Sequence, residues 1–443
     1  MKTSIPPSWQ VCRLEACVEV LDALRVPVNN AERLARIEGK PTEDLYPYYG
    51  ATGQTGVIDN FLFDEELVAL GEDGVPFLDP MKPKAYMLQG KTWVNNHAHV
   101  LREVKGVSNN KFICHYLNQF DYQGYVNGGT RLKLTQASMR AIPIPLPPLA
   151  EQTRIAQALD GLLARVDTLK ARLDALPALI KRFRQSVLSA AVSGDLTKAW
   201  RQVRGLPEIS EVIISNLIKD GPQNGLYKAS SAYGGGVKIV RIDSFYSGEL
   251  IDWKLLRSLE INDRELATWA LNQGDILINR VNSIEYLGKC ALIRSTPEPA
   301  VFESNIMRLS LKSECVDAEY LMRFLSSEIG RTRLISNAKH AVNQASINQA
   351  DVRACKVPLP HLDEQKEIVH RVDQLFAFAD QFEARLTDAR AHVDALTQSI
   401  LAKAFRGELV PQDPADEPAS ALLERITAQR AATPKPKRGR KSV

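Results

Sequence analysis

Ile144-Pro145-Leu146-Pro147-Pro148-Leu149-Ala150-Glu151-Gln152 has a second copy, Val357-Pro358-Leu359-Pro360-His361-Leu362-Asp363-Glu364-Gln365, at an offset of 213 residues. The match continues without a gap to Gly194-Asp195-Leu196, which corresponds to Gly407-Glu408-Leu409. Upstream it reaches Gln136-Ala137, which corresponds to Gln349-Ala350. A gapless repeat of roughly sixty residues indicates that the same structural element occurs twice in the chain.

Each copy carries a stripe of apolar residues at alternating steps of three and four. Such a stripe buries one face of a helix against another helix. We therefore expect two long helices, Glu151–Ala191 and Glu364–Ala404, packed on each other. The alternative is two amphipathic helices that each cover a separate core. The residues expected in the interface of the helix pair are Leu162, Val166, Leu169, Leu173, Leu375, Phe382, Leu386 and Leu396.

The sequence also predicts where these helices end or bend. Gly194 and Gly407 follow the last periodic residues and are expected to stop the helices in a left-handed conformation. Pro177 lies inside the first helix, where its missing N–H costs about 3 kcal/mol. We expect a kink or a break at Pro177 and a straighter second helix, which has Arg390 at that position.

Composition sets broad limits. The 443 residues suffice for two or three domains, and 44% of them are hydrophobic, as in ordinary globular proteins. No stretch approaches the roughly 20 apolar residues of a membrane span, and the N-terminus lacks a signal-peptide core. None of the six cysteines forms a Cys-x-x-Cys pair, so neither a zinc site nor a disulfide framework is indicated. We expect the protein in the cytoplasm.

The sequence outside the repeat predicts two globular heads. We expect an α+β protein: two mixed α/β heads separated by two repeated helices packed as an antiparallel coiled coil, with a pseudo-twofold internal repeat. Thr92–Leu101 is expected to be one strand and Asn127–Arg131 a turn. The predicted divisions are 1–142 (first head), 143–199 (central helical region), 200–355 (second head), 356–410 (distal helical region) and 411–443 (C-terminal appendage with a basic tail).

Motifs for catalysis are missing from the sequence. There is no Gly-x-x-x-x-Gly-Lys-[Ser/Thr] phosphate loop, no Gly-x-Gly-x-x-Gly after a strand, and no Asn/Asp-Pro-Pro-aromatic run. His97 and His99, with Cys114-His115, could ligate a metal, but histidines that pack or bond to backbone in a sheet are the favoured interpretation. Gly234–Gly236 is more typical of a flexible turn than of a phosphate site. We assign no catalytic or metal-binding residue.

What remains is a duplicated binding protein with two heads. Such a protein suits a two-part, asymmetric site on a long ligand, and duplex DNA is a ligand of this kind. A helix of about 41 residues spans roughly 60 Å. That length can separate two heads by one to two DNA turns of ~10 base pairs each. Each head would read base edges with polar side chains and hold phosphates with others.

The sequence resembles the specificity subunit of type I restriction-modification systems over nearly its whole length. The most specific marks are two Pro-Leu-Pro-x-Leu-x-Glu-Gln-x-x-Ile blocks, at 145–155 and 358–368, each followed by a long helix that ends in Gly-[Asp/Glu]-Leu. Three further stretches are similar to family patterns: Tyr46-Pro47-Tyr48-Tyr49-Gly50, Asn95-Asn96-His97-Ala98-His99-Val100 and Gly274-Asp275-Ile276-Leu277. Pro177 and the basic tail depart from the pattern.

The resemblance implies a non-catalytic subunit whose heads are target recognition domains, each reading half of a split DNA sequence. The repeated helices would act as a spacer and bind two methyltransferase subunits. Restriction motor-nuclease subunits would complete the assembly. No cofactor would bind this chain. Its partners would use S-adenosylmethionine, ATP and magnesium.

Polar loop residues of the two heads are the candidates for contacts with double-stranded DNA. Two other function classes stay open: a coiled-coil scaffold with two protein-binding heads, and an enzyme with an unrecognised site. DNA affinity that falls steeply with salt would distinguish DNA binding from the scaffold. The candidate residues are Tyr48, Thr52, Gln54, Asn127, Thr130, Arg131 and Lys133 in the first head, and Tyr233, Lys238, Asn279, Arg280, Asn282, His340, Asn343 and Gln344 in the second.

Overall fold

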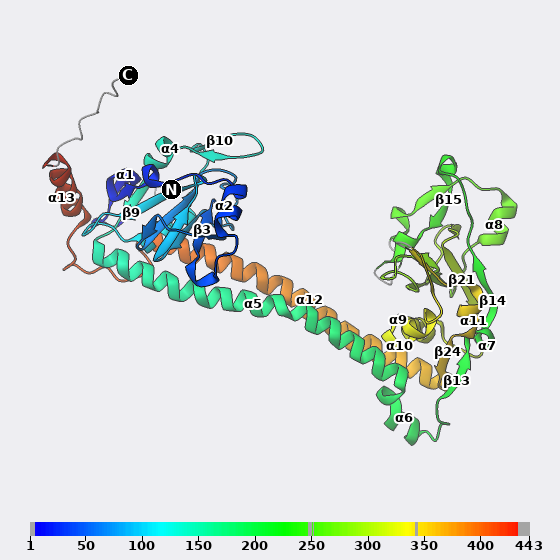
Figure 1. Cartoon of the computed structure of the whole chain (residues 1–443). Coiled ribbons are helices and arrows are strands. Elements are labelled where there is room, and N and C mark those ends of the chain that lie inside the picture. Colours follow the sequence, from blue (N-terminus) through cyan, green and yellow to red (C-terminus); the bar gives the residue numbers. More distant parts are fainter. Residues whose placement is uncertain (1–4, 247–249, 251, 342–343, 433–443) are drawn as a thin grey trace. The chain divides into compact units, whose positions relative to one another are not determined.

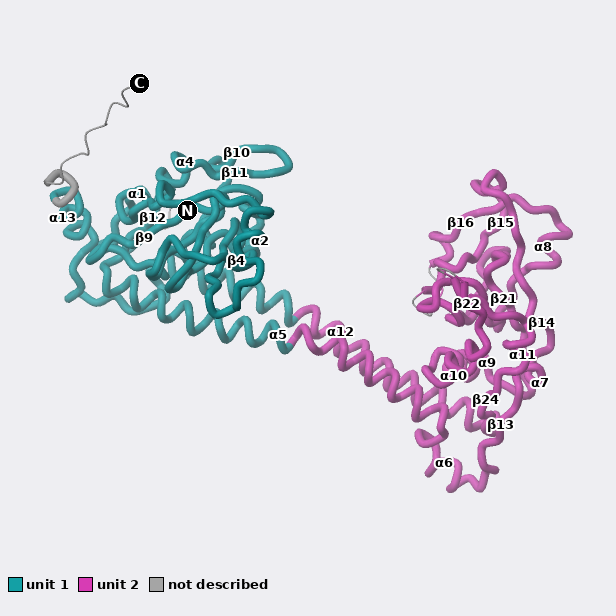
Figure 2. The backbone as a smooth tube through the Cα atoms, in the orientation of Figure 1, with its two compact units in different colours: residues 1–172, 389–443 teal, residues 173–388 magenta. Residues whose placement is uncertain are grey.

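The computed structural model of the chain describes residues 5–246, 250, 252–341 and 344–432 (Figure 1). The chain forms two compact units (Figure 2). Unit 1 comprises residues 1–172 and 389–443, and unit 2 comprises residues 173–388. Each unit therefore combines one head with one end of each long helix. In the part of the chain that the structure describes, no helix is long and apolar enough to cross a membrane.

The two repeat copies form long helices, as predicted: α5 is Leu149–Ser193 and α12 is Leu362–Phe405. In unit 1, Lys170 of α5 pairs with Asp394 of α12 at 2.7 Å. In unit 2, Arg184 of α5 pairs with Asp380 at 2.6 Å and with Glu383 at 3.0 Å. The beginning of each helix thus lies with the end of the other, which makes the pair antiparallel.

α5 is a single helix that continues through Pro177. Of the expected kink or break, the break therefore does not occur, and the kink stays a prediction. Pairing with α12 on both sides of the proline offsets its missing hydrogen bond. The predicted left-handed stops are confirmed, with φ of +79° at Gly194 and +76° at Gly407. A side chain at either glycine would be strained, because L-residues rarely adopt this conformation.

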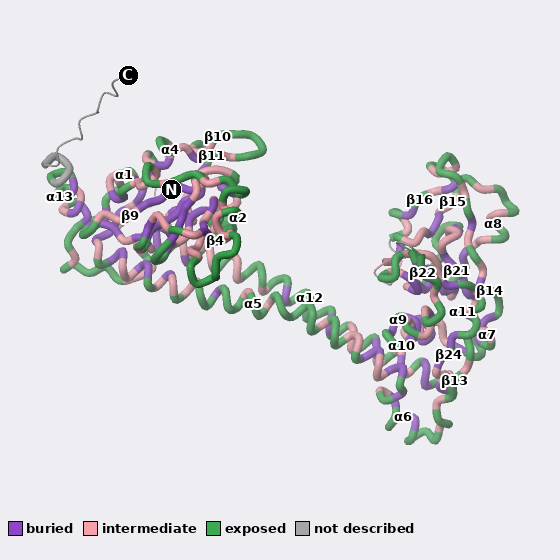
Figure 3. Tube along the Cα trace, viewed as in Figure 1, coloured by how far each residue is buried: buried purple, intermediate pink, exposed green. Residues whose placement is uncertain are grey.

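The helix-pair residues differ in burial. Val166 and Leu386 are buried, and Leu162, Leu173 and Leu375 are half-buried. Leu169, Phe382 and Leu396 are 44%, 46% and 47% exposed, so these three lie at the margin of the pair and not in its core. An α-helix drifts by about 20° per heptad relative to a strict 3.5-residue repeat, which turns part of the stripe away from a single partner helix. The middle turns of both helices are largely exposed (Figure 3).

Two four-stranded sheets form the head of unit 1. An antiparallel sheet has the order β2–β9–β6–β7, and a mixed sheet has the order β4–β3–β8–β5. Helix α3 (Asn110–Gln119) packs on β6 and β7, and β1 (Gln10–Arg13) pairs with β12 (Pro143–Leu146) at the entry to α5. The strand bounds are β2 Val18–Val20, β3 Tyr46–Gly50, β4 Gly53–Ile58, β5 Phe63–Asp64, β6 Leu67–Gly71, β7 Ala85–Leu88, β8 Lys91–Val94 and β9 Ala98–Glu103.

The expectation of one strand over Thr92–Leu101 is wrong. β8 ends at Val94, and β9 begins at Ala98 in the other sheet. Asn95 interrupts the strand because its side-chain oxygen accepts a hydrogen bond from the His97 backbone N–H at 2.8 Å. This side-chain turn competes with continued strand pairing. The interruption moves the chain from one sheet to the next.

The head of unit 2 repeats this topology although its sequence differs. The order β14–β21–β17–β19 corresponds to β2–β9–β6–β7, and β16–β15–β20 corresponds to β4–β3–β8, including the parallel pairing of β15 with β20. β13 (Ser210–Ile213) pairs with β24 (Lys356–Leu359), as β1 does with β12. The other strands are β14 Ile218–Asn224, β15 Tyr233–Val240, β16 Arg257–Leu259, β17 Ile276–Asn279, β19 Cys290–Leu292, β20 Ala300–Phe302 and β21 Ile306–Leu311.

The helices of the heads are short and cover the sheet surfaces. In unit 2, α9 and α10 lie against one another, and α9 contacts β19. Their bounds, with those of the other short helices, are α1 Leu14–Cys17, α2 Asn30–Ile37, α4 Gln136–Arg140, α6 Lys198–Val203, α7 Ile214–Leu217, α8 Asp263–Trp269, α9 Ala318–Ser326, α10 Glu328–Leu334 and α11 Gln349–Ala354.

The C-terminal appendage is an integral part of unit 1. Helix α13 (Ala419–Ala432) buries Leu422 and Ile426 in the core that also contains Trp9, Leu14 and Ile155. The Ala419 N–H donates to the Ser8 carbonyl at 3.1 Å, and Arg154 pairs with Asp416 at 2.6 Å. The appendage therefore covers the start of the first head. The basic tail, 433–443, lies outside the described residues.

Candidate nucleic-acid interface

Two exposed hairpins occupy equivalent positions of the repeat. In unit 1 the hairpin is β10 (Val126–Asn127) and β11 (Lys133–Leu134). In unit 2 it is β22 (Lys339–Ala341) and β23 (Gln344–Ser346). The offset of 213 residues relates Val126 to Lys339 and Lys133 to Ser346. Among the described residues, six candidates fall on these hairpins: Asn127, Thr130, Arg131, Lys133, His340 and Gln344.

Each hairpin is held by the segment that follows a central strand of its sheet. In unit 1, the Leu134 N–H donates to the Glu72 carbonyl at 2.7 Å. In unit 2, the Ile347 N–H donates to the Arg280 carbonyl at 2.9 Å. Leu134 and Ile347 correspond through the repeat, so Glu72 and Arg280 are structural equivalents. The sequence did not reveal this correspondence because the two segments share no residue pattern.

The charges around the two hairpins are different. In unit 1, Arg131 pairs with Asp73 at 2.9 Å and Lys133 pairs with Glu72 at 3.3 Å. His97 also contacts the Asp73 carboxylate, through Nδ1 at 2.9 Å. In unit 2 the corresponding segment is Arg280-Val281-Asn282, in which β18 (Val281–Asn282) pairs with β23. Unlike chemistry on a shared scaffold is suited to reading two different base sequences.

Further polar and aromatic groups lie beside the unit 2 hairpin. The Asn282 amide donates to the Tyr246 hydroxyl at 3.4 Å, and the Tyr246 and Tyr286 rings stack with centroids 4.1 Å apart. The Lys289 ammonium lies 5.0 Å from the centre of the Tyr286 ring. Arg280 donates to the Ser304 carbonyl at 3.1 Å. Arg280 and Asn282 therefore have different partners within this head.

A basic hollow of about 640 Å³ opens beside β15 of unit 2. Tyr233, Arg241, Arg257 and Lys228 line it, with Glu303 paired to Arg241 at 3.2 Å. Burial raises the pKa of the Tyr233 hydroxyl, so this group stays a neutral hydrogen-bond donor at physiological pH. The sequence identified Tyr233 as a candidate but not the three cationic residues Arg241, Arg257 and Lys228. The available sequence signal was that these residues are spaced along segments rich in glycine and polar residues. This signal is weak.

Two candidates are unsuited to direct contact with a ligand. Tyr48 is only 5% exposed, and its hydroxyl donates to the Val28 carbonyl at 3.1 Å. Asn279 is fully buried within β17. Both residues lie in strands, where alternate side chains point into the core. Lys238 is half-buried and donates to the Leu256 carbonyl at 3.2 Å.

The remaining candidates are distributed as follows. Thr52 and Gln54 are exposed at the β3–β4 turn, and the Gln54 amide donates to the Gly56 carbonyl at 3.1 Å. His340 and Gln344 are exposed on their hairpin. Asn343 lies outside the described residues. The structure thus gathers the hairpin residues of each head, whereas Thr52 and Gln54 belong to a separate turn.

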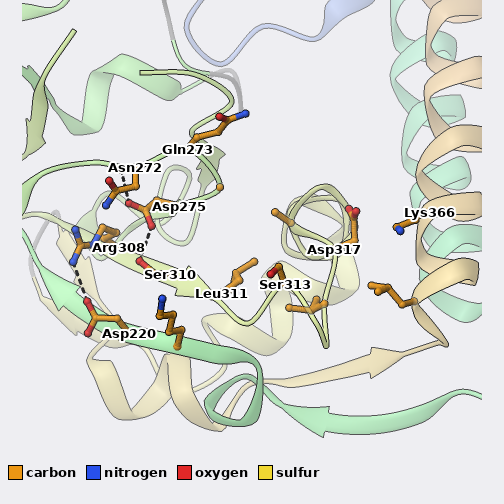
Figure 4. A pocket seen from close by; sticks show the side chains of 15 residues that line it. Asp220, Asn272, Gln273, Asp275, Arg308, Ser310, Leu311, Ser313, Asp317 and Lys366 are labelled. Carbon is orange, nitrogen blue, oxygen red and sulfur yellow. Dashed lines mark hydrogen bonds and ion pairs between the residues drawn. The ribbon is translucent and has the colours of Figure 1, made fainter. Parts of the chain in front are cut away.

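A second hollow in unit 2, of about 590 Å³, is lined by an internally paired polar network (Figure 4). Arg308 donates to the Asp220 carboxylate at 3.1 Å, and Asp275 accepts from the Ser310 hydroxyl at 2.6 Å. Burial raises the pKa of the Asp275 carboxyl. Because these groups satisfy one another, the network stabilises the sheet and gives no arrangement of nucleophile and base.

The histidines considered as metal ligands each contact a carboxylate. His97 contacts Asp73 at 2.9 Å, His99 contacts Asp22 at 2.7 Å, and His115 contacts Asp160 at 2.8 Å. Across the described residues, no three His, Cys, Asp or Glu side chains gather in a metal-binding group. The sequence favoured histidines that pack or bond to backbone, and His99 does contact the Leu134 carbonyl through Nε2 at 3.0 Å, whereas the carboxylate partners were not predicted.

Comparisons with known proteins agree with this architecture. The family described as "Type I restriction modification DNA specificity domain" matches residues 30–178 and 226–389. The EcoKI specificity subunit of Escherichia coli K12 is 39% identical over 344 residues, which cover 74% of this chain and 74% of that protein. The EcoDI specificity subunit of Escherichia coli is 30% identical over 462 aligned positions, which cover 99% of this chain and 98% of that protein.

Solved structures show the same fold at low sequence identity. The HsdS subunit of Thermoanaerobacter tengcongensis superposes with a TM-score of 0.57 at 18% identity, over 92% of this chain and 99% of that one. A chain from a study of assembly and conformational transition of the type I R-M system gives a TM-score of 0.60 at 16% identity, over 92% and 100%.

The duplicated two-headed fold and these matches define a DNA-sequence-recognition subunit, a class that is not catalytic. The chain belongs to the family of type I restriction-modification specificity subunits.

Proposed function

We propose that this chain acts in the cytoplasm as the subunit that recognises a bipartite, asymmetric DNA target for a type I methyltransferase and restriction enzyme. The observation that carries the proposal is the pair of exposed hairpins at equivalent repeat positions, with different side chains on a shared scaffold. One head would read each half of the target, in line with the predicted domain divisions. The contacts with DNA would come from exposed residues such as Arg131 and Lys133 in unit 1, and His340 and Gln344 in unit 2.

The repeated helices supply surfaces for two copies of one partner. Leu169 corresponds to Phe382 through the repeat, and Phe183 corresponds to Leu396. All four side chains are 37–47% exposed. Each unit therefore presents one such apolar pair, Leu169 and Leu396 in unit 1 and Phe183 and Phe382 in unit 2. Exposed apolar groups at matching positions suit docking of two methyltransferase subunits, with motor-nuclease subunits joining the assembly.

Methylation mapping tests the recognition role. The chain is expressed in cells with its methyltransferase subunit, and genomic DNA is read by single-molecule sequencing. The expected result is one modified motif in two parts with a fixed gap. If the complex forms but no motif appears, the coiled-coil scaffold is the better description. In that case DNA affinity would also lack the steep salt dependence of phosphate contacts.

Native mass spectrometry tests the docking surfaces. Phe382→Glu and Leu169→Glu are each expected to lower the number of bound methyltransferase subunits from two to one. The double variant is expected to bind none. Gln381→Glu places the same charge on an exposed neighbouring position and serves as the control. Retention of two subunits by both single variants would exclude these surfaces.

A further inference from the structure

The Arg131 side chain in unit 1 is oriented before any ligand is present. Its Nη2 donates to Asp73 Oδ1 at 2.9 Å, while the side chain is 63% exposed. An exposed ion pair contributes little to stability, because water screens its charges. The pair therefore matters little for folding, and its consequence is the direction in which the guanidinium points.

A bare glycine beneath the guanidinium provides a second constraint. A β-carbon on Gly74 would lie 3.3 Å from Arg131 Nε and 3.6 Å from its Nη2. Gly74 has φ of +68°, a conformation that favours glycine, and its N–H donates to the Leu132 carbonyl at 3.1 Å. The guanidinium thus lies on a surface without a side chain, next to the carboxylate that binds one edge of the group.

The carboxylate is itself held in place. His97 Nδ1 contacts the same Asp73 Oδ1 at 2.9 Å, and Asp73 forms a backbone bridge with Lys133 of the hairpin. The His97 backbone is fixed in turn by the Asn95 side chain at 2.8 Å. Two segments therefore hold Arg131 in place. Asp73, after β6, binds its guanidinium, and His97 and Asn95, in the turn between β8 and β9, hold Asp73.

We propose that Arg131, oriented by Asp73 over Gly74, reads one guanine in the half of the DNA target that unit 1 recognises. The inference rests on the proposed function. Arginine binds the O6 and N7 atoms of guanine with two parallel donors in the major groove. A planar fork whose Nη2 is bound by a carboxylate presents its remaining donors in a restricted set of directions, which lowers the entropy lost on binding. Asp73 acts as a positioning residue.

The equivalent site of unit 2 lacks this arrangement. Gln344 precedes Ser346 by two residues, as Arg131 precedes Lys133, and the segment beneath carries Val281 where unit 1 has Asp73. The carboxylate and the guanidinium therefore occur together in unit 1 and are absent together from these positions in unit 2. This co-occurrence supports a shared role.

The test is methylation mapping with the complete methyltransferase complex. Wild type is expected to give a split motif with a guanine in one half. Arg131→Gln and Asp73→Ala are each expected to reduce discrimination about tenfold to a hundredfold at that single base. Asp73→Asn, which keeps an acceptor oxygen, is expected to reduce it less. Gln344→Ala is expected to change the other half only, which identifies the half that unit 1 reads.

Two controls separate base reading from a structural role. Lys133→Gln removes a neighbouring cation and is expected to lower modification at all sites without changing the motif. Arg102→Gln removes a half-buried ion pair with Glu65 elsewhere in unit 1 and is expected to change neither the level of modification nor the motif. Complexes of all variants are first compared for thermal midpoint, because a folding defect would lower modification uniformly.

The outcomes of the two proposals are distinguishable. A wild-type complex without any split motif would refute the proposed function. A wild-type split motif that Arg131→Gln leaves unchanged, or a broadened base that is not guanine, would refute this inference alone. A uniform loss of modification in Asp73→Ala with an unchanged motif would reduce Asp73 to a structural role and also overturn it.

Discussion

Glu151 and Glu364 occupy the same position of the internal repeat, and both are buried in the first turn of their helices but bind different partners. Glu364 accepts hydrogen bonds from the Thr197 hydroxyl at 2.6 Å and from the Arg201 guanidinium at 2.8 Å. Glu151 accepts from the Trp9 indole at 3.0 Å and from the Gln412 amide. In both units, the segment that follows the end of the other helix returns to this carboxylate.

Glu364→Gln is expected to destabilise unit 2 by about 3–5 kcal/mol, because it leaves the buried Arg201 without its closest carboxylate. Arg201 is 7% exposed, whereas its second acidic partner, Glu208 at 3.6 Å, is 86% exposed and screened by water. Hydrogen exchange of the amides around residues 197–201 measures the change. Glu208→Gln is the control and is expected to change stability by less than about 1 kcal/mol. Equal destabilisation by Glu364→Gln and Glu208→Gln would contradict the conclusion that Glu364 is the main partner of Arg201.

Glu151 gives unit 1 a pH dependence. Burial raises the pKa of this carboxyl, despite hydrogen bonds from Trp9 and Gln412 that lower it. An acid whose pKa is higher in the folded state binds more protons there than in the unfolded chain. Its contribution is therefore fully present below the ordinary glutamate pKa and is lost as the pH rises through the raised value.

Glu151→Gln removes this titration. The stability of unit 1 in the variant, relative to wild type, is expected to increase as the pH rises from below the ordinary glutamate pKa to neutrality. Urea unfolding at several pH values, combined with hydrogen exchange near Trp9, measures the difference. A difference that stays constant with pH, or that falls as the pH rises, would show that burial does not control this group.

The C-terminal appendage is expected to stabilise the first head. Truncation after residue 410 removes Leu422 and Ile426 from the core and deprives Glu151 of Gln412. Losing the burial of these two aliphatic side chains costs about 3–6 kcal/mol, at 1.5–3 kcal/mol each. Faster hydrogen exchange in β1 and α1 is the expected signature. Truncation after residue 432 removes only the basic tail and is the matched control, with unchanged exchange expected.

The helical part of the fold could be predicted in detail because it follows from local rules. The stripe spacing predicts paired helices, and Gly194 and Gly407 are the residues with a left-handed conformation at their ends. The equivalence of the two heads could not be predicted, since it lies in strand order and not in residue identity. β6 and β17 take the same place in their sheets with different sequences.

The candidate interface could be predicted only in part for a similar reason. Turn-forming sequence located the unit 1 hairpin at Asn127–Arg131, because Asn and Gly favour turns. The unit 2 hairpin was not predicted as a turn, although His340 and Gln344 were chosen from it. Asp73 and His97 were not found as partners of Arg131, since they are distant in the chain and meet it only through sheet packing. Tyr48 and Asn279 were chosen as polar residues near glycine turns, but strand alternation buries them.

The helix pair offers a direct comparison of one buried and one exposed leucine within unit 2. Leu386 is 7% exposed, whereas Leu179 is 52% exposed. Leu386→Ala is expected to destabilise unit 2 by about 2–5 kcal/mol, through lost burial and the cavity left behind. Leu179→Ala removes the same atoms from an exposed site and introduces a good helix former, so a change within about 0.5 kcal/mol is expected.

Denaturant unfolding, with hydrogen exchange to assign the change to unit 2, measures both variants. The difference in unfolding free energy between Leu386→Ala and Leu179→Ala is the informative quantity, because helix propensity and chain composition change equally in the two variants. If Leu386→Ala changes stability as little as Leu179→Ala, α5 and α12 do not form a stabilising pair in solution. A large effect at Leu386 alone would show that the stripe of α12 contributes to stability where the helix pair covers it.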